Sequence, residues 1–119
     1  MTSDQNQSPH VSINTFIAIE GGIEALTAFQ ITEMEDMNEE ATTYGWLGNE
    51  VYRSQDNTSL IVLTRFQSAE AMEDWAQTRR FRRHIENLEP LIQNGTSIPL
   101  TFVAAHGDTH MTDGSKPLS

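Results

Sequence analysis

SAEAMEDWAQTRRFRRHIENL, residues 68–88, holds two short helical patterns between regions of strand character. Ser68 can cap the first helix and Thr78 the second, because each side chain can accept hydrogen bonds from free backbone N–H groups of the first turn. In the second pattern the positions i, i+3, i+4 and i+7 are Phe81, His84, Ile85 and Leu88. The spacing therefore predicts that His84 points inward with this apolar stripe, as Trp75 does in the first helix.

Four of the chain's seven Lys and Arg residues lie in this stretch, although the formal net charge of the protein is −10. These four are Arg79, Arg80, Arg82 and Arg83. We expect them on the outer side of the short helix, where they either guide an anionic substrate or pair with carboxylates. The candidate carboxylates belong to Glu73, Asp74, Glu86 and Glu89, or to an acidic helix of a partner subunit.

Strand patterns surround this helical region on both sides. Residues 11–19, 49–54, 59–66 and 98–105 are predicted as strands, and residues 93–97, around Asn94-Gly95, as a loop. A glycine-bracketed corner, YGWLG at residues 44–48, leads into the second strand. With a helix predicted over residues 23–41, the order is β-α-β-β-α-β, which is typical of the ferredoxin-like α+β fold with a four-stranded antiparallel sheet.

The first predicted strand, VSINTFIAI, carries apolar side chains on both faces. Val11, Ile13, Ile17 and Ile19 alternate with a second set, Asn14, Phe16 and Ala18. A sheet in a small domain usually leaves one face wet, so two apolar faces indicate that a second subunit covers one of them. We therefore expect a C2 homodimer.

The helix over residues 23–41 is predicted to be amphipathic. Its inward positions are Ile23, Leu26, Phe29 or Gln30, Met34, Met37 and Ala41. The opposite side carries Glu33, Glu35, Asp36, Glu39 and Glu40, and we expect this acidic side to be solvated.

Length and composition narrow the class of protein. The 119 residues suit one domain, expected over residues 11–105, with disordered polar tails at 1–10 and 106–119. The excess of 17 Asp and Glu over 7 Lys and Arg opposes nucleic-acid binding. No apolar run approaches the roughly 20 residues that span a bilayer. The chain has no cysteine, and its N-terminus has no signal-peptide pattern, so we expect a cytoplasmic protein without disulfides or thiolate chemistry.

Over residues 11–105 the chain resembles the antibiotic biosynthesis monooxygenase family, whose members are dimeric ferredoxin-like α+β barrels. The resemblance rests on the corner at residues 44–48, the strand end TRFQS at residues 64–68, and a set of single positions after it. These positions are Glu70, Ala71, Trp75, Phe81, His84, Leu88, Pro90 and Leu91. The resemblance implies a small monooxygenase that oxygenates a flat aromatic substrate with molecular oxygen, without flavin or nicotinamide, in a pocket between sheet and helices.

Two kinds of substrate follow from this resemblance. In the heme-degrading branch, Asn14 would donate a hydrogen bond to bound oxygen species, Trp75 would form the wall that distorts the porphyrin, and His84 would ligate the iron. The nearby arginines could then meet the propionates. Heme is thus a possible substrate or ligand, although no cofactor is required.

In the branch that oxidises polyketide anthrones or quinols, the same cavity would work without iron. His84 would be the base, while Asn14 and Trp75 position the phenol, and burial together with the neighbouring arginines would keep the imidazole neutral. Tyr52 and Tyr44 are candidate hydrogen-bonding partners of the phenol. The substrate-binding residues that we expect are Phe16, Tyr52, Phe66, Phe81 and Arg79.

Structural roles would account for the same residues. Trp75 can be a core residue of its helix, His84 can be a core histidine that is hydrogen-bonded to a carbonyl, and Asn14 can satisfy a strand edge or bulge. The corresponding alternative function is a non-catalytic ligand-binding or stress-response dimer of the same fold.

Overall fold

A computed structural model describes residues 9–108, so most of the two predicted tails, residues 1–8 and 109–119, lies outside the described part. The sheet has the strand order β2-β3-β1-β4, and all three pairings are antiparallel. This arrangement confirms the predicted βαββαβ fold with a split second helical region. The elements are β1 (His10–Ala18), α1 (Ile23–Thr43), β2 (Trp46–Arg53), β3 (Ser59–Phe66), α2 (Ala69–Ala76), α3 (Arg79–Leu88), the 3-10 helix η2 (Glu89–Leu91) and β4 (Ile92–Leu100).

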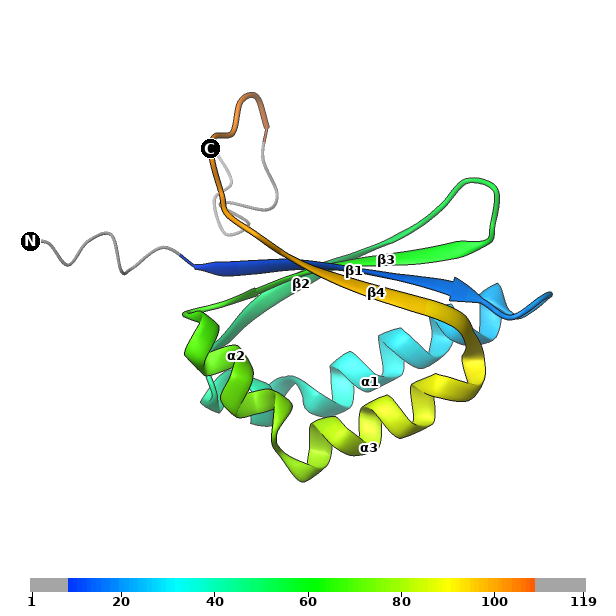
Figure 1. The fold of residues 1–119 in the computed structure, drawn as a ribbon, viewed down its shortest axis with the longest axis horizontal. Coiled ribbons are helices and arrows are strands. Elements are labelled where there is room, and N and C mark those ends of the chain that lie inside the picture. The colour runs from blue at the N-terminus through cyan, green and yellow to red at the C-terminus, as the bar shows by residue number, and fades with distance from the viewer. Residues whose placement is uncertain (1–8, 109–119) are drawn as a thin grey trace, which may run out of the picture.

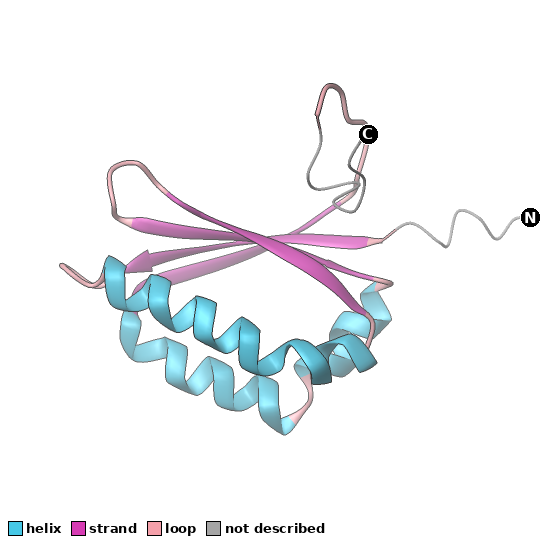
Figure 2. Ribbon diagram, turned by 180° about the vertical axis from the view of Figure 1, so that it is seen from behind, coloured by secondary structure: helices cyan, strands magenta, loops and turns pink. Residues whose placement is uncertain are grey.

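All the helices cover one face of the sheet, as Figures 1 and 2 show from opposite sides. The long helix α1 and the shorter α3 run side by side beneath the strands, and α2 lies at one end (Figure 1). No helix crosses the opposite face of the sheet in the described part of the chain. This face is called the outer face below.

The helix boundaries follow from local chemistry. The Ser68 hydroxyl accepts a hydrogen bond from the Ala71 backbone N–H at 3.0 Å, and the Thr78 hydroxyl accepts one from Phe81 N–H at 3.1 Å. Each cap satisfies a backbone donor that has no partner within its own helix, which stabilises the helix by about 1 kcal/mol. The predicted caps are confirmed, and they fix the short α2–α3 break that points Trp75 and His84 toward the sheet.

Two clusters of buried apolar residues hold the layers together. One contains Ala18, Ile23, Leu26, Leu60 and Leu88, and the other contains Met37, Ala41, Phe66 and Trp75. Helix α1 contributes to both clusters, through Leu26 near its start and Met37 near its end. Between them its buried stripe carries two polar residues, Gln30 and Glu33, which are 4% and 9% exposed. The core is therefore interrupted at the middle of α1.

The fourth strand differs from the prediction. Residues 93–97 belong to β4, so the predicted loop over these residues is wrong. The predicted strand over 98–105 is confirmed for residues 98–100 and wrong for 101–105, because β4 runs from Ile92 to Leu100. The Asn94-Gly95 pair is read locally as a turn, but here Asn94 pairs with Ile17 and Gly95 with Phe16. A Cβ atom on Gly95 would lie only 3.2 Å from the Phe16 ring, so the glycine makes room for this aromatic side chain.

The second strand begins earlier than expected. Trp46 already pairs with Phe66, and a bulge between Trp46 and Gly48 adjusts the register. The predicted corner is thus partly strand. Within residues 9–108, no helix combines the length and the apolar character needed to cross a membrane.

Candidate functional site

A cavity of about 440 Å³ lies where the core is interrupted, between the sheet and the helices. Its floor is the helix-facing side of the strands and its walls come from α1, α2 and α3. Apolar and aromatic side chains dominate the lining, with polar groups from Asn14, Gln30 and His84 among them. A volume of this size suits a compact ring system, since small-molecule sites measure roughly 300–1,000 Å³.

Six of the eight predicted site residues line this one cavity. Asn14, Trp75 and His84 were expected to carry the chemistry, and they come from β1, α2 and α3. The other three were expected to bind substrate, and they are Phe16, Phe66 and Phe81. Strand alternation explains why Asn14 and Phe16 of β1 both reach the cavity, because residues 12, 14, 16 and 18 face the helices.

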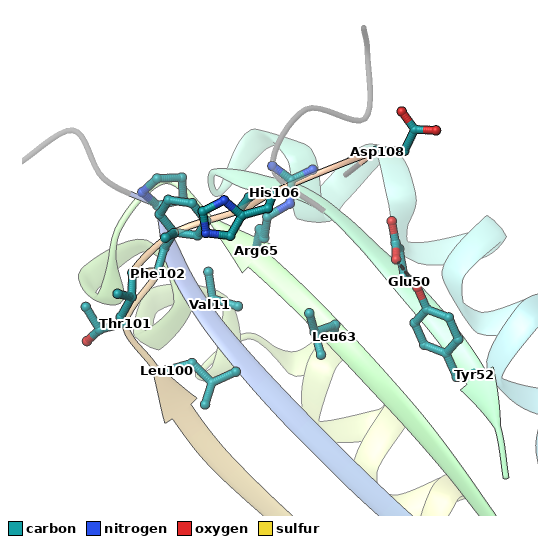
Figure 3. A pocket seen from close by; sticks show the side chains of 14 residues that line it. Val11, Glu50, Tyr52, Leu63, Arg65, Leu100, Thr101, Phe102, His106 and Asp108 are labelled. Atoms are coloured by element: carbon teal, nitrogen blue, oxygen red, sulfur yellow. Dashed lines mark hydrogen bonds between the residues drawn. The ribbon is translucent and has the colours of Figure 1, made fainter. Parts of the chain in front are cut away.

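Tyr52 and Arg79 lie outside the cavity. Tyr52 pairs with Ile61, whereas its neighbour Val51 pairs with the buried Val62, so alternation turns Tyr52 to the outer face. There its hydroxyl hydrogen-bonds the Glu50 carboxylate (Figure 3). Arg79 is exposed at the start of α3.

Tyr44, the other candidate phenol partner, does not line the cavity either. It packs against Trp75 with ring centroids 5.7 Å apart and is 38% exposed.

His84 is held on three sides in the cavity wall. Its side chain is buried, and its Nδ1 atom lies 2.8 Å from Glu33 Oε1. The Phe29 ring stacks on the imidazole at a centroid distance of 5.4 Å, and Phe81 touches it at 5.9 Å. These contacts leave Nε2 as the ring nitrogen that is available to a ligand.

Glu33 is the functional candidate that the sequence pattern missed. We expected it on the solvated side of α1, but its side chain is 12% exposed and reaches two residues of α3. Besides His84, it accepts two hydrogen bonds from the Arg80 guanidinium, at 3.1 and 3.3 Å. The spacing of Leu26, Gln30 and Glu33 at i, i+4 and i+7 was the available signal, because it places both polar residues on the apolar stripe.

The arginines separate into two kinds. Arg80 pairs with Glu33 and is largely buried, whereas Arg79, Arg82 and Arg83 are exposed. None of the predicted carboxylate partners takes Arg80. The expectation that all four lie on the outer side of α3 is therefore wrong for Arg80, because α1 packs close enough for its carboxylate to be the nearest anion.

The protonation states of His84 and Glu33 follow from their burial and from the neighbouring charges. Burial lowers the pKa of His84, and Arg80 adds to this, while the Glu33 carboxylate acts in the opposite direction without reversing it. For Glu33, burial alone would raise the pKa, but the bonds from Arg80 and His84 outweigh it and the net pKa is lowered. At neutral pH the site thus holds a carboxylate, a guanidinium and a neutral imidazole.

Gln30 adds a second polar group that sequence reasoning left open. Its side chain lines the cavity, and its Oε1 atom is buried without a hydrogen-bond partner among residues 9–108. A buried amide without partners costs free energy unless something pairs with it. A polar group of a bound ligand would supply that pairing.

The lining residues do not fit heme. A heme carries two propionate carboxylates, and the described cavity lining contains no Lys or Arg side chain to meet them. The one ionised arginine close to the imidazole, Arg80, is committed to Glu33.

The sequence model of one family, Antibiotic biosynthesis monooxygenase, matches residues 23–87. No curated protein matches the chain. Solved structures that share the fold include the following three. Rv0793 from Mycobacterium tuberculosis is 18% identical, with a TM-score of 0.69 and coverage of 84% of this chain and 100% of that one.

PA3566 from Pseudomonas aeruginosa is 23% identical, with a TM-score of 0.65 and coverage of 82% and 96%. A variant of SnoaB, a cofactor-independent oxygenase from Streptomyces nogalater, is 13% identical, with a TM-score of 0.68 and coverage of 85% and 99%. At these identities the three structures support the fold.

Proposed function

The chain belongs to the antibiotic biosynthesis monooxygenase family, and on that premise we propose that it oxygenates a flat, uncharged aromatic compound, such as a polyketide anthrone or a quinol, without flavin or nicotinamide. The observation that carries this proposal is His84. It is a buried neutral imidazole in the wall of an aromatic cavity, with Nδ1 bonded to a carboxylate and Nε2 available.

In the proposed reaction, Nε2 of His84 removes a proton from the ring carbon or hydroxyl of the substrate. The deprotonated substrate keeps the electron pair on its ring and is electron-rich enough to reduce molecular oxygen. A carbon–oxygen bond forms between the ring carbon and the oxygen molecule. For an anthrone methylene, His84 returns its proton to the resulting peroxide. The second C–H bond of that carbon then breaks together with the O–O bond, so that its hydrogen and the departing OH leave as water and the carbon becomes a carbonyl. The balance is one CH2 group plus O2, giving one carbonyl group plus water.

The other residues that line the cavity orient the substrate and contact its rings and oxygens. Trp75 and Phe81 meet at a centroid distance of 6.1 Å, and with Phe16 and Phe66 they offer aromatic faces against which a planar ring system can pack. The amides of Asn14 and Gln30 can hydrogen-bond the substrate oxygens, where negative charge develops after proton removal.

The charge of the lining favours an uncharged substrate over heme. Glu89 is the ionisable carboxylate of the described lining, and no cation accompanies it. A substrate with carboxylates would therefore enter a site that offers it no counter-charge.

The test is oxygen uptake with an anthrone and with a hydroquinone as substrates. His84→Gln should lower the rate by about 100-fold or more, because a general base contributes roughly that factor. Asn87→Ala is the control, since Asn87 is exposed on the same helix as His84 and does not line the cavity, and it should leave the rate unchanged. Wild-type protein that consumes no oxygen with either substrate, or a His84→Gln variant with full activity, would overturn the proposal.

A heme titration separates the other substrate class. We expect no Soret band shift that depends on His84. A band that forms with wild-type protein and is lost in His84→Gln would instead assign the site to heme.

A further inference from the structure

We propose that Glu33 is a positioning residue that holds His84 in a single tautomer, with its proton on Nδ1, and that Arg80 fixes Glu33 for this task. The consequence for catalysis rests on the oxygenase function proposed above, whereas the tautomer itself can be observed without any substrate.

The tautomer follows from the hydrogen-bond geometry. His84 Nδ1 and Glu33 Oε1 are 2.8 Å apart, and an ionised carboxylate can only accept hydrogen bonds. Nδ1 must therefore carry the hydrogen. In a neutral imidazole the other nitrogen, Nε2, then has the free electron pair and can act as a base.

Arg80 ensures that Glu33 stays an acceptor. Its guanidinium bonds both oxygens of the carboxylate, at 3.1 Å to Oε2 and 3.3 Å to Oε1, in the forked arrangement that fixes the carboxylate plane. The side chains of Arg80, Glu33 and His84 are only 12%, 12% and 8% exposed, so water competes little for these bonds. The lowered pKa of Glu33 agrees with a carboxylate that is ionised at neutral pH.

The imidazole ring of His84 also cannot easily flip by half a turn about its Cβ–Cγ bond. Phe29 lies nearly parallel to the His84 ring, at an interplanar angle of 12°, and Phe81 packs on the ring as well. A ring flip would move Nδ1 away from Glu33 and leave this largely buried carboxylate with one partner fewer. The contacts from α1 and α3 thus select one orientation and one tautomer.

This arrangement matters most when the base takes up a proton. The imidazole then becomes positively charged, and Glu33 is the anion that faces it. Loss of Glu33 should therefore reduce kcat, because the charge forms during the reaction, and leave KM nearly unchanged, because Glu33 does not line the cavity.

The decisive measurement is nitrogen NMR on protein labelled with 15N-histidine. The chain has four histidines, and the signals of His84 are assigned by their absence in His84→Gln. Wild-type protein should show a protonated, pyrrole-type Nδ1 and an unprotonated, pyridine-type Nε2. In Glu33→Met this preference should disappear, and in Glu33→Gln, whose amide can donate as well as accept, it should become a mixture.

Glu35→Gln is the matched control, because Glu35 is an exposed acid on the same helix, and it should keep the wild-type tautomer. Arg80→Met removes the cation that holds Glu33 as an ionised acceptor, so it should weaken the preference for a proton on Nδ1, and it tests the arrangement if the Glu33 variants fold poorly. In an active enzyme, Glu33→Gln should lower kcat by about 100-fold with KM within about twofold of wild type.

A wild-type His84 that carries its proton on Nε2, or that keeps its tautomer in Glu33→Met, would overturn the proposal. If the tautomer behaves as expected but no oxygen is consumed, the positioning role stands and the oxygenase function fails.

Discussion

Gln30 places an amide oxygen, Oε1, in the cavity wall, and none of residues 9–108 hydrogen-bonds it. Replacing Gln30 with leucine removes a buried polar group that the fold leaves unsatisfied. We predict that Gln30→Leu keeps or raises the free energy of unfolding while weakening ligand binding by about 10-fold, because one hydrogen bond to the ligand is lost. Urea unfolding and a binding titration of the same variant measure both effects.

Opposite changes in stability and affinity are not expected for a residue that only packs. Thr27→Val serves as the control, because this neighbouring α1 hydroxyl bonds the Ile23 carbonyl oxygen at 2.7 Å and does not line the cavity. A Gln30→Leu variant that is destabilised and binds normally would contradict a ligand-facing role.

Single residues also mark where sequence reasoning succeeded and where it stopped. His84 and Trp75 could be placed in the cavity from helical spacing alone. Phe81 lies three residues before His84 and Leu88 four after it, while Ala71 and Met72 lie four and three residues before Trp75. The partners of Glu33 could not be identified in this way, because they lie 47 and 51 positions away along the chain. The spacing of Glu33 from Leu26 and Gln30 was the one local signal that it faces inward, and that spacing does not name the residues of α3 that it bonds.

At the scale of elements, the Glu33 carboxylate joins α1 to α3. We predict that Arg80→Met lowers the free energy of unfolding by about 3 kcal/mol, because it leaves a largely buried carboxylate with one partner fewer. The double variant Glu33→Met/Arg80→Met should cost less than the sum of the two single variants. Chemical denaturation of the wild type, the two single variants and the double variant gives the free energies of this double-mutant cycle.

Arg83→Met is the control for this cycle, since Arg83 is exposed on the same helix, and its effect should stay within about 0.5 kcal/mol. Strictly additive single effects would show that the two helices are not coupled through this ion pair.

The strands show the same division between local and distant information. The β1 and β3 strands could be located from alternation and β-branched residues, and the caps at Ser68 and Thr78 from residue type. The start of β4 could not, because Asn94-Gly95 has the local chemistry of a turn. Only pairing with β1, and the Phe16 ring that needs the space over Gly95, makes this pair part of a strand.

At the scale of the whole molecule, the outer face of the sheet carries exposed apolar side chains. Ile17, Ile98 and Leu100 are 36%, 53% and 39% exposed. A hollow of about 660 Å³ lies on this face between the strands and residues 101–108, bordered by Val11, Leu63 and Phe102 (Figure 3). We propose that a second copy of the chain covers this face.

We predict a dimer by sedimentation at micromolar concentration, and a monomer for Ile98→Glu, because a charge would then be buried at the interface. Ile31→Glu is the control. Ile31 is an equally exposed isoleucine, at 51%, but lies on α1 on the helical side of the molecule, and its variant should remain dimeric. A monodisperse wild-type monomer would contradict the proposal.

The interruption of the core at Gln30 and Glu33 has a thermodynamic consequence. The cavity is bordered by residues of both apolar clusters, Leu88 on one side and Trp75 on the other. A planar ligand between them would act as an internal layer of the protein and contact both clusters. At a concentration one hundred times its Kd, such a ligand would add about 2.7 kcal/mol to the free energy of unfolding. Thermal melting in the presence of candidate aromatics would therefore rank ligands before any reaction is known, since the compound that best completes the interior raises Tm most.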